Sequence, residues 1–446
     1  MRCGIRKIRD SVSDFQSYEG KVLWMNDSFV TKISINRVRN IKDTVIELSD
    51  TEAKNLIITG PNGSGKTSLL EALRLNITNR LKWDSEVVTL GDNPLKNQFL
   101  MGKATVADDA EVKDSIEAIF NPPKDEEIRQ RISEISGIDV DFSNFDKMRE
   151  EYLQGKFIVS YYKAEREYDI ASQKGTRKVD LKDAYTVSES PGEDFVEYIK
   201  TLIIQENMYR NQQENAVLVE GLRQRVERVK EMLRNIYDNE AIDFDFDIAN
   251  MNLRIKEPEK QPYGFNELAS GYAAILSIVL DLMMRMEKKV TDAYDLPGIV
   301  MIDEVDAHLH LAMQRNVLKN LTKLFPNIQF IVTTHSPFVL SSVDNAVIYD
   351  LGRKQRVGSE AGLSKLPYSG IVEGYFGASE LSAQLKKDFE RYKELAQKDD
   401  LTDDDYEELG NLENILDDIP DFLALGIMAD YRQIQSELQA REEGKA

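Results

Sequence analysis

Residues 60–67 have the residue types and the spacing of a phosphate-binding loop. They read Gly-Pro-Asn-Gly-Ser-Gly-Lys-Thr, which fits the pattern G-x-x-x-x-G-K-[ST], and they follow a short apolar segment, 55–59. The glycines let backbone N–H groups turn towards phosphates, and a helix that begins at Lys66 adds the positive end of its dipole. The alternative is a chance glycine turn before a helix, and the strand and helix on either side disfavour it. We predict that the loop binds a nucleoside triphosphate through Gly60, Asn62, Gly63, Ser64, Gly65, Lys66, Thr67 and Ser68.

Two adjacent carboxylates end a second apolar segment, which reads Ile-Val-Met-Ile-Asp-Glu over 299–304. Thr67 and Asp303 provide the hard oxygen atoms that suit Mg²⁺ beside phosphate oxygens, with Asp303 binding the ion directly or through a water molecule. Glu304 is placed to accept a proton from the attacking water as a general base. Two solvated acids at a strand end are the alternative, and the upstream phosphate-binding loop favours the catalytic interpretation.

All three histidines lie within 28 residues of one another, at positions 308, 310 and 335. His335 follows the apolar segment 328–334, where we predict a catalytic role: donating to the γ-phosphate or holding the attacking water. A histidine after a strand is more often structural, but its place beyond the acid pair reverses that judgement. His308 and His310 lack a third ligand nearby, so we predict no zinc site.

The pentapeptide Leu-Ala-Ser-Gly-Tyr, 268–272, opens a long apolar helix over 273–286. We predict Ser270 as the N-cap and Gly271 as open backbone for an anion, with both residues in contact with nucleotide. An ordinary N-cap is the alternative. The pentapeptide lies some thirty residues before the acid pair, and this position favours contact with the nucleotide over an ordinary N-cap.

The elements that must position these residues follow from hydrophobic periodicity. Most of 86–153 is charged and is predicted to be helical. A helical hairpin or arm is predicted over 194–237, where apolar residues recur at helical spacing from Leu218 to Ile236. Strands are predicted at 30–35, 44–48, 55–59, 157–162, 242–248, 253–255, 297–304, 328–334 and 346–351, with helices at 66–80 and 311–324. We therefore predict an α/β chain.

Composition limits the class of protein. The 446 residues include 57 basic and 78 acidic ones, a net charge of −21, with 41% hydrophobic and 30% charged residues. Two or three folded domains are expected. Because no apolar run is long enough to span a bilayer and residues 1–14 lack a signal-peptide core, we expect a cytoplasmic protein. The single cysteine excludes a disulfide framework and a cysteine-built zinc site. The acidity disfavours a general nucleic-acid coat protein, although a local basic groove is compatible with DNA binding.

Taken in order, these four pieces resemble the ABC-type ATPases of the SMC and RecF kind. Residues 60–67 match Walker A, 268–272 the signature, 299–304 Walker B and 334–337 the switch histidine, and the resemblance covers about 30–351. It implies an ABC-ATPase head (a mixed sheet with the P-loop), ATP and Mg²⁺ as ligands, and a head-to-tail homodimer or larger rings of dimers. The implied domains are a flexible N-terminus at 1–20, an ATPase domain at 21–352 with a helical insertion and arm at about 84–240, and an acidic helical C-terminal module at 353–446.

Residues 267–276 and 330–337 are also similar to stand-alone ATPases of bacterial anti-phage operons, first the PtuA-type subunit of Septu and retron systems and second the PARIS ATPase. This likeness implies a partner nuclease, of HNH type first and TOPRIM type second, with DNA as a further candidate and no membrane partner. Two features depart from the SMC pattern. His310 stands where the D-loop has aspartate, and no Q-loop glutamine can be placed, because 162–167 occupies its region.

Other classes of protein are less well supported. Residues 371–374 and 403–405 imitate a TOPRIM nuclease, but no alternating strands surround them, so we predict no intrinsic nuclease. A transporter ATPase would need a membrane partner and a Q-loop. An SMC/RecF-like ATPase of DNA repair is the main alternative, because the arm carries Arg223, Arg225, Arg228, Lys230 and Arg234, although acids interleave with them. Residues 377–446 hold 19 acids against 8 bases, which suits a basic partner.

Overall fold

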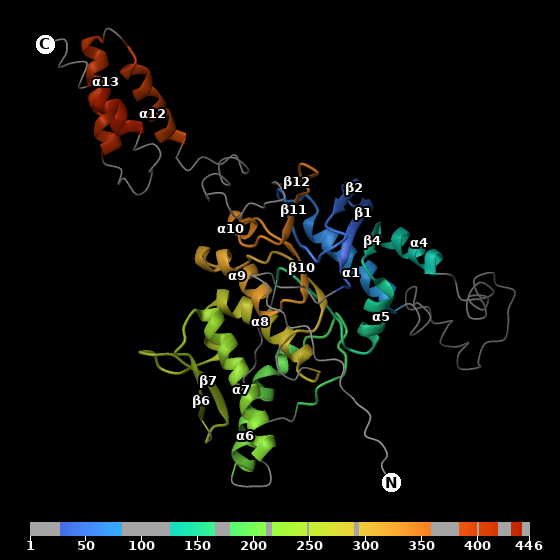
Figure 1. Cartoon of the computed structure of the whole chain (residues 1–446). Coiled ribbons are helices and arrows are strands. Elements are labelled where there is room, and N and C mark those ends of the chain that lie inside the picture. The colour runs from blue at the N-terminus through green and yellow to red at the C-terminus, as the bar shows by residue number, and fades with distance from the viewer. Residues whose placement is uncertain are drawn as a thin grey trace, which may run out of the picture. The chain divides into compact units, whose positions relative to one another are not determined.

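The computed structural model describes residues 27–82, 125–165, 179–210, 216–247, 249–289, 294–357, 383–398, 401–417 and 430–438. The chain divides into two compact units, Met1–Ser364 and Lys365–Ala446, which are treated separately below (Figure 1). The predicted flexible N-terminus, most of the insertion before residue 125 and the TOPRIM-like segment 371–374 lie outside the described residues.

The first unit is built on a six-stranded sheet in the order β12-β11-β3-β10-β9-β5. Five strands are parallel: β5 (Ile158–Tyr162), β9 (Gly298–Ile302), β10 (Ile328–Thr333), β3 (Asn55–Thr59) and β11 (Ala346–Asp350). The short strand β12 (Gln355–Arg356) is antiparallel to β11. Every residue of β3, β9 and β10 is buried, which explains their continuous apolar sequences. Because parallel strands end at one edge, the segments after β3, β9 and β10 meet there.

A second sheet has the order β2-β1-β4, from β1 (Val30–Val38), β2 (Ile41–Glu47) and β4 (Ile138–Phe142). The helix α1 (Lys66–Lys82) packs against strands of both sheets, and one apolar core joins them. The strand β4 corrects the expectation of a helical stretch over 86–153. Ile138 and Val140 are buried and alternate with Asp139 and Asp141, the pattern of a half-buried strand. The two acids bind Arg129 of α4 (Asp125–Ser136), and α5 (Phe145–Leu153) follows.

The arm predicted from helical periodicity consists of α6 (Phe195–Tyr209) and α7 (Ala216–Tyr237), which pack on each other (Figure 1). The apolar stripe of α7 is its buried face, from Leu222 to Ile236. A small sheet follows, β6 (Asp243–Asp247), β7 (Asn252–Lys256) and β8 (Tyr263–Gly264). The described residues of this unit also form the helices α8 (Ser270–Met286), α9 (Leu311–Leu324) and α10 (Pro337–Leu340).

The second unit is helical in its described part. The helices α12 (Ala383–Ala396) and α13 (Asp403–Asp417), and the helix 430–438, enclose a core that includes Tyr392, Leu412 and Tyr431. Asp405 binds Lys398 and the Thr402 backbone, so this carboxylate anchors the start of α13. The predicted fold class is therefore confirmed: an α/β unit whose mixed sheet carries the phosphate-binding loop, a helical arm and a helical C-terminal module. Among the described residues, no helix combines the length and apolarity needed to cross a bilayer.

Candidate functional site

The phosphate-binding loop runs from the end of β3 to the first residue of α1. Gly60, Gly63 and Gly65 have φ values of 140°, 76° and 99°, which L side chains rarely adopt. A Cβ on Gly65 would lie 2.9 Å from Ile41 Cδ1 and 3.1 Å from Asn40 Oδ1, so the start of β2 and the turn between β1 and β2 pack directly on the loop. Asn40 of that turn donates from Nδ2 to Gly63 O at 3.2 Å. The hairpin therefore supports the loop from outside the motif.

The side chain of Lys66 bonds to the backbone at the start of the phosphate-binding loop. Its Nζ donates to Gly60 O at 3.0 Å and to Pro61 O at 3.1 Å, and the residue is buried. Burial lowers the pKa of Lys66, and the negative charges of Glu304, Asp303, Asp306 and Asp350 oppose that decrease. The predicted metal ligand and the predicted base therefore act on the same ammonium group, although they come from another strand.

The acid pair after β9 is held by one buried hydroxyl. Thr333 Oγ1 donates to Asp303 Oδ1 at 2.5 Å and accepts from the Glu304 N–H at 2.7 Å. Glu304 has a φ of 46°, in the left-handed region, where a residue with a side chain is strained. Such strain persists only where surrounding bonds hold it and is concentrated at functional sites. The sequence indicated the two acids but not the threonine that positions them.

The segment after β10 is bonded to the loop after the acid pair. Thr334 Oγ1 donates to Asp306 Oδ1, and Ser336 Oγ donates to Gln314 Oε1 at 2.7 Å. Gln314 in turn donates to Leu309 O at 2.8 Å. These bonds place His335 between two fixed neighbours at the strand edge.

His335 lies in the field of the same charges as Lys66. Burial lowers its pKa, as does the positive charge of Lys66, and the carboxylates of Asp306, Glu304 and Asp303 oppose the decrease. The imidazole is therefore neutral at pH 7, so one ring nitrogen is a donor and the other an acceptor. This state suits either role predicted for it.

The structure corrects the predicted role of Ser270 as N-cap. The helix α8 begins at Ser270 itself, Ala269 is the cap residue, and no side-chain cap bond forms. Gly271 is buried, and a Cβ there would lie 3.0 Å from His308 O and 3.2 Å from Met313 Sδ. The start of α8 therefore packs on the loop that follows the acid pair.

The donors expected for Mg²⁺ are Thr67 and Asp303. Asp303 is buried at the end of β9, Thr67 is exposed at the start of α1, and both provide oxygen. No group of three or more metal-ligating His, Cys, Asp or Glu side chains occurs in the described part of the chain. A hydroxyl, a carboxylate, phosphate oxygens and water need no such group, so the donor set fits Mg²⁺ bound with a nucleotide.

Comparison with known proteins finds that the chain is similar to ATPases. A family model described as an AAA ATPase domain matches residues 193–340, which contain every predicted site residue except those of the phosphate-binding loop. The Septu protein PtuA of Bacillus mycoides is 25% identical over 441 residues, which cover 93% of this chain and 54% of PtuA. The Retron Ec83 probable ATPase of Escherichia coli is 34% identical over 149 residues, 32% of this chain and 28% of that relative. The resemblance to Septu and retron ATPases is therefore confirmed.

Solved structures with a similar chain path include the SMC head domain from Thermotoga maritima, at 14% identity and a TM-score of 0.33, covering 72% of this chain and 94% of that one. A nucleotide-free ATP-binding cassette from an ABC transporter matches at 14% identity and a TM-score of 0.32, covering 75% and 92%. The chain spans about half the length of the Bacillus mycoides PtuA and less than a third of the Ec83 ATPase.

Proposed function

We propose that this chain is the ATP-binding and ATP-hydrolysing subunit of a bacterial anti-phage defence complex, in which it regulates a partner nuclease through ATP-dependent assembly. The observation that carries the proposal is the meeting of three strand ends, because β3, β10 and β9 are neighbouring parallel strands of one sheet. The loop with Lys66 follows β3, the pair Asp303 and Glu304 follows β9, and His335 follows β10. Phosphoryl transfer from ATP with Mg²⁺ uses a lysine at the β- and γ-phosphates, oxygen ligands for the metal and a group that orients or deprotonates the attacking water.

The proposed reaction uses the chain's own groups as follows. Lys66 exchanges its two carbonyl partners for the β- and γ-phosphates, and the loop N–H groups hold the phosphate oxygens. Glu304 takes the proton of the attacking water, and the neutral His335 orients that water or donates to the γ-phosphate. Mg²⁺, held by Thr67 and Asp303, would neutralise charge that develops on the β- and γ-oxygens.

We propose a dimer in which Ser270 and Gly271 act across the interface, as the resemblance to ABC-type ATPases implies. Their helix packs on residues 308–313 of its own chain, and the proposal is that they complete the site of a neighbouring molecule. A head-to-tail arrangement with two-fold symmetry provides two such composite sites. Larger rings of dimers are compatible with the same contact.

The partner is proposed from the relatives and from charge. Septu and retron ATPases are the confirmed likeness, and the acidic helical second unit suits a basic nuclease, of HNH type first and TOPRIM type second. No intrinsic nuclease is proposed for this chain. The domain limits proposed are an ATPase domain at 21–352 and a C-terminal module at 353–446.

The alternative, an SMC/RecF-like ATPase that binds DNA in repair, rests on the cations of α7. In the structure these cations have acidic neighbours: Arg223 binds Glu220 at 2.8 Å, Lys230 binds Asp243 at 2.6 Å and Arg234 binds Glu227 at 2.7 Å. Cations that are already paired offer less to phosphates, so we favour the defence subunit.

The test is ATP hydrolysis by the purified chain. Lys66→Ala should abolish nucleotide binding, with the exposed Lys319→Ala as the matched control. Glu304→Gln should bind ATP and lose hydrolysis, with Glu52→Gln as its control. Native turnover by Glu304→Gln would refute the assigned base, and strong DNA-stimulated hydrolysis without a partner would favour the repair ATPase.

A further inference from the structure

A buried hydrogen-bonded cluster lies on α8, three turns beyond Ser270. Asp281 is 4% exposed and accepts three hydrogen bonds: from Tyr162 Oη at 2.7 Å, from Arg285 Nε at 2.7 Å and from the Gly192 N–H at 3.0 Å. The three donors come from β5, from α8 itself and from the turn before α6. A buried carboxylate is stable only with such partners, so the cluster ties three segments together.

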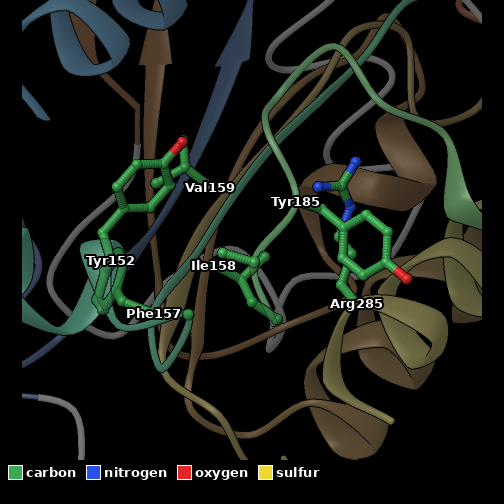
Figure 2. Close-up of a pocket in the computed structure, with 8 residues that line it drawn as sticks. Tyr152, Phe157, Ile158, Val159, Tyr185 and Arg285 are labelled. Atoms are coloured by element: carbon green, nitrogen blue, oxygen red, sulfur yellow. The ribbon is translucent and has the colours of Figure 1, made fainter. Parts of the chain in front are cut away.

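Arg285 extends the cluster to the loop that leads into the arm. Its guanidinium donates to Thr186 O at 3.0 Å and to Glu189 O. Figure 2 shows Arg285 beside Tyr185, with Ile158 of β5 facing them, and these three residues line a small pocket. At Gly192 a Cβ would lie 2.9 Å from Asp281 Cα, so the loop backbone rests directly on α8. The root of the arm is therefore fastened to α8.

Tyr162 connects this cluster to the nucleotide site. Its carbonyl oxygen accepts the Asp303 N–H at 2.8 Å, while its hydroxyl donates to Asp281. One residue thus contacts the predicted Mg²⁺ ligand with its backbone and α8 with its side chain. Burial, and then the charge of Asp281, raises the pKa of the Tyr162 hydroxyl well above its ordinary value. The hydroxyl therefore remains a donor throughout the physiological pH range.

We propose that Tyr162 is a positioning residue that couples the acid pair to α8 and to the root of the arm. A shift of Asp303 on nucleotide binding is passed through Tyr162 to Asp281. Because Asp281 belongs to α8, its movement shifts the helix, whose first residues, Ser270 and Gly271, lie about 16 Å and eleven residues away. Tyr162 lies at the start of the segment in which no Q-loop glutamine could be placed. The inference rests on the proposed ATPase function, and it specifies how that site is regulated.

The chain offers a matched control for this bond. Tyr198 Oη donates to Glu287 Oε1 at 2.7 Å, the same length as the Tyr162 bond, and Glu287 is the C-cap residue of α8. Glu287 is also buried and keeps the Tyr294 hydroxyl as a partner. Tyr198→Phe and Tyr162→Phe therefore remove equivalent bonds, but only Tyr162 contacts the acid pair. Both full-length variants should be compared with the wild type for melting temperature, ATP affinity, kcat and, in the Glu304→Gln background, ATP-dependent dimerisation.

We expect Tyr162→Phe to leave the Kd for ATP within about twofold and to lower kcat about tenfold, equivalent to about 1.4 kcal/mol. ATP-dependent dimerisation should weaken by a similar factor, because Ser270 and Gly271 are no longer positioned for the neighbour. Tyr198→Phe should lower the melting temperature by about as much as Tyr162→Phe does, because the two variants lose equivalent hydrogen bonds. Its kcat should stay within about twofold of the wild-type value. Equal kcat in the two variants would overturn the proposal.

A measurement on the wild type covers the case in which Tyr162→Phe does not fold. Addition of a non-hydrolysable ATP analogue with Mg²⁺ should slow amide exchange at Gly192, whose N–H is bonded to Asp281, and leave the amides around Glu287 unchanged. Unchanged exchange at Gly192 would refute the coupling. If the wild type neither binds nor hydrolyses ATP, it is the proposed function that fails.

Discussion

Removing the Thr333 hydroxyl tests how the acid pair is held. Thr333→Val keeps the side-chain shape but removes the donor to Asp303 and the acceptor of the Glu304 N–H. The bond from the Thr333 hydroxyl to the charged Asp303 is worth about 1.5–3 kcal/mol. The left-handed conformation of Glu304 costs about 1–2 kcal/mol, and the bond from the Glu304 N–H to Thr333 offsets part of that cost. If about 2.7 kcal/mol of this is expressed in the transition state, kcat falls about 100-fold.

The assay is steady-state ATP hydrolysis together with nucleotide binding. Because the phosphate-binding loop is unchanged, the Kd for ATP should change by less than about threefold, so that the effect appears in kcat. Thr333→Ser restores a hydroxyl and should recover most of the rate. Thr44→Val is the control, since Thr44 is a buried strand threonine whose hydroxyl bonds Lys42 O at 2.8 Å, outside the site. A folded Thr333→Val variant with native kcat would refute the positioning role.

Three further predictions concern pH, the dimer and the second unit. The pKa of His335 is lowered from 6.5 in the folded chain, so below about pH 6.5 the unfolded chain binds a proton there that the folded chain does not, and stability falls as the pH falls. His335→Asn should therefore reduce the loss of melting temperature between pH 7.5 and 5.5. The same loss in the variant and the wild type would contradict this prediction. Mixing Lys66→Ala chains with Ser270→Arg chains should restore partial ATPase activity, because each mixed dimer keeps one composite site, and failure at every ratio would argue against sharing. Truncation after Ser364 should leave ATP hydrolysis intact while the partner no longer co-purifies, and loss of hydrolysis would instead make the second unit part of the ATPase.

Some of the fold was predictable because its signals are local. The continuous apolar strands and the stripe of α7 were identified from periodicity, since their spacing directly reflects the face that is buried. The strand β4 was missed because its two aspartates made the segment look like a charged helix. Its strand conformation depends on pairing with β1, which is far from it in the sequence, and on the contact of its aspartates with Arg129 of the preceding helix.

The sequence alone determined which residues are candidates for the chemistry. Each motif is short, and the phosphate-binding loop needs glycines at φ values that other residues avoid, so its spacing is visible without a structure. The supporting residues were decided only by the tertiary structure. Thr333 meets Asp303 across 30 positions of the chain, and Tyr162 meets Asp281 across 119. A threonine or tyrosine at a strand end has no sequence pattern of its own, because its partner is selected by parallel pairing and helix packing. The predicted site is thus a set of local motifs, and the way its parts are held together is a property of the folded chain.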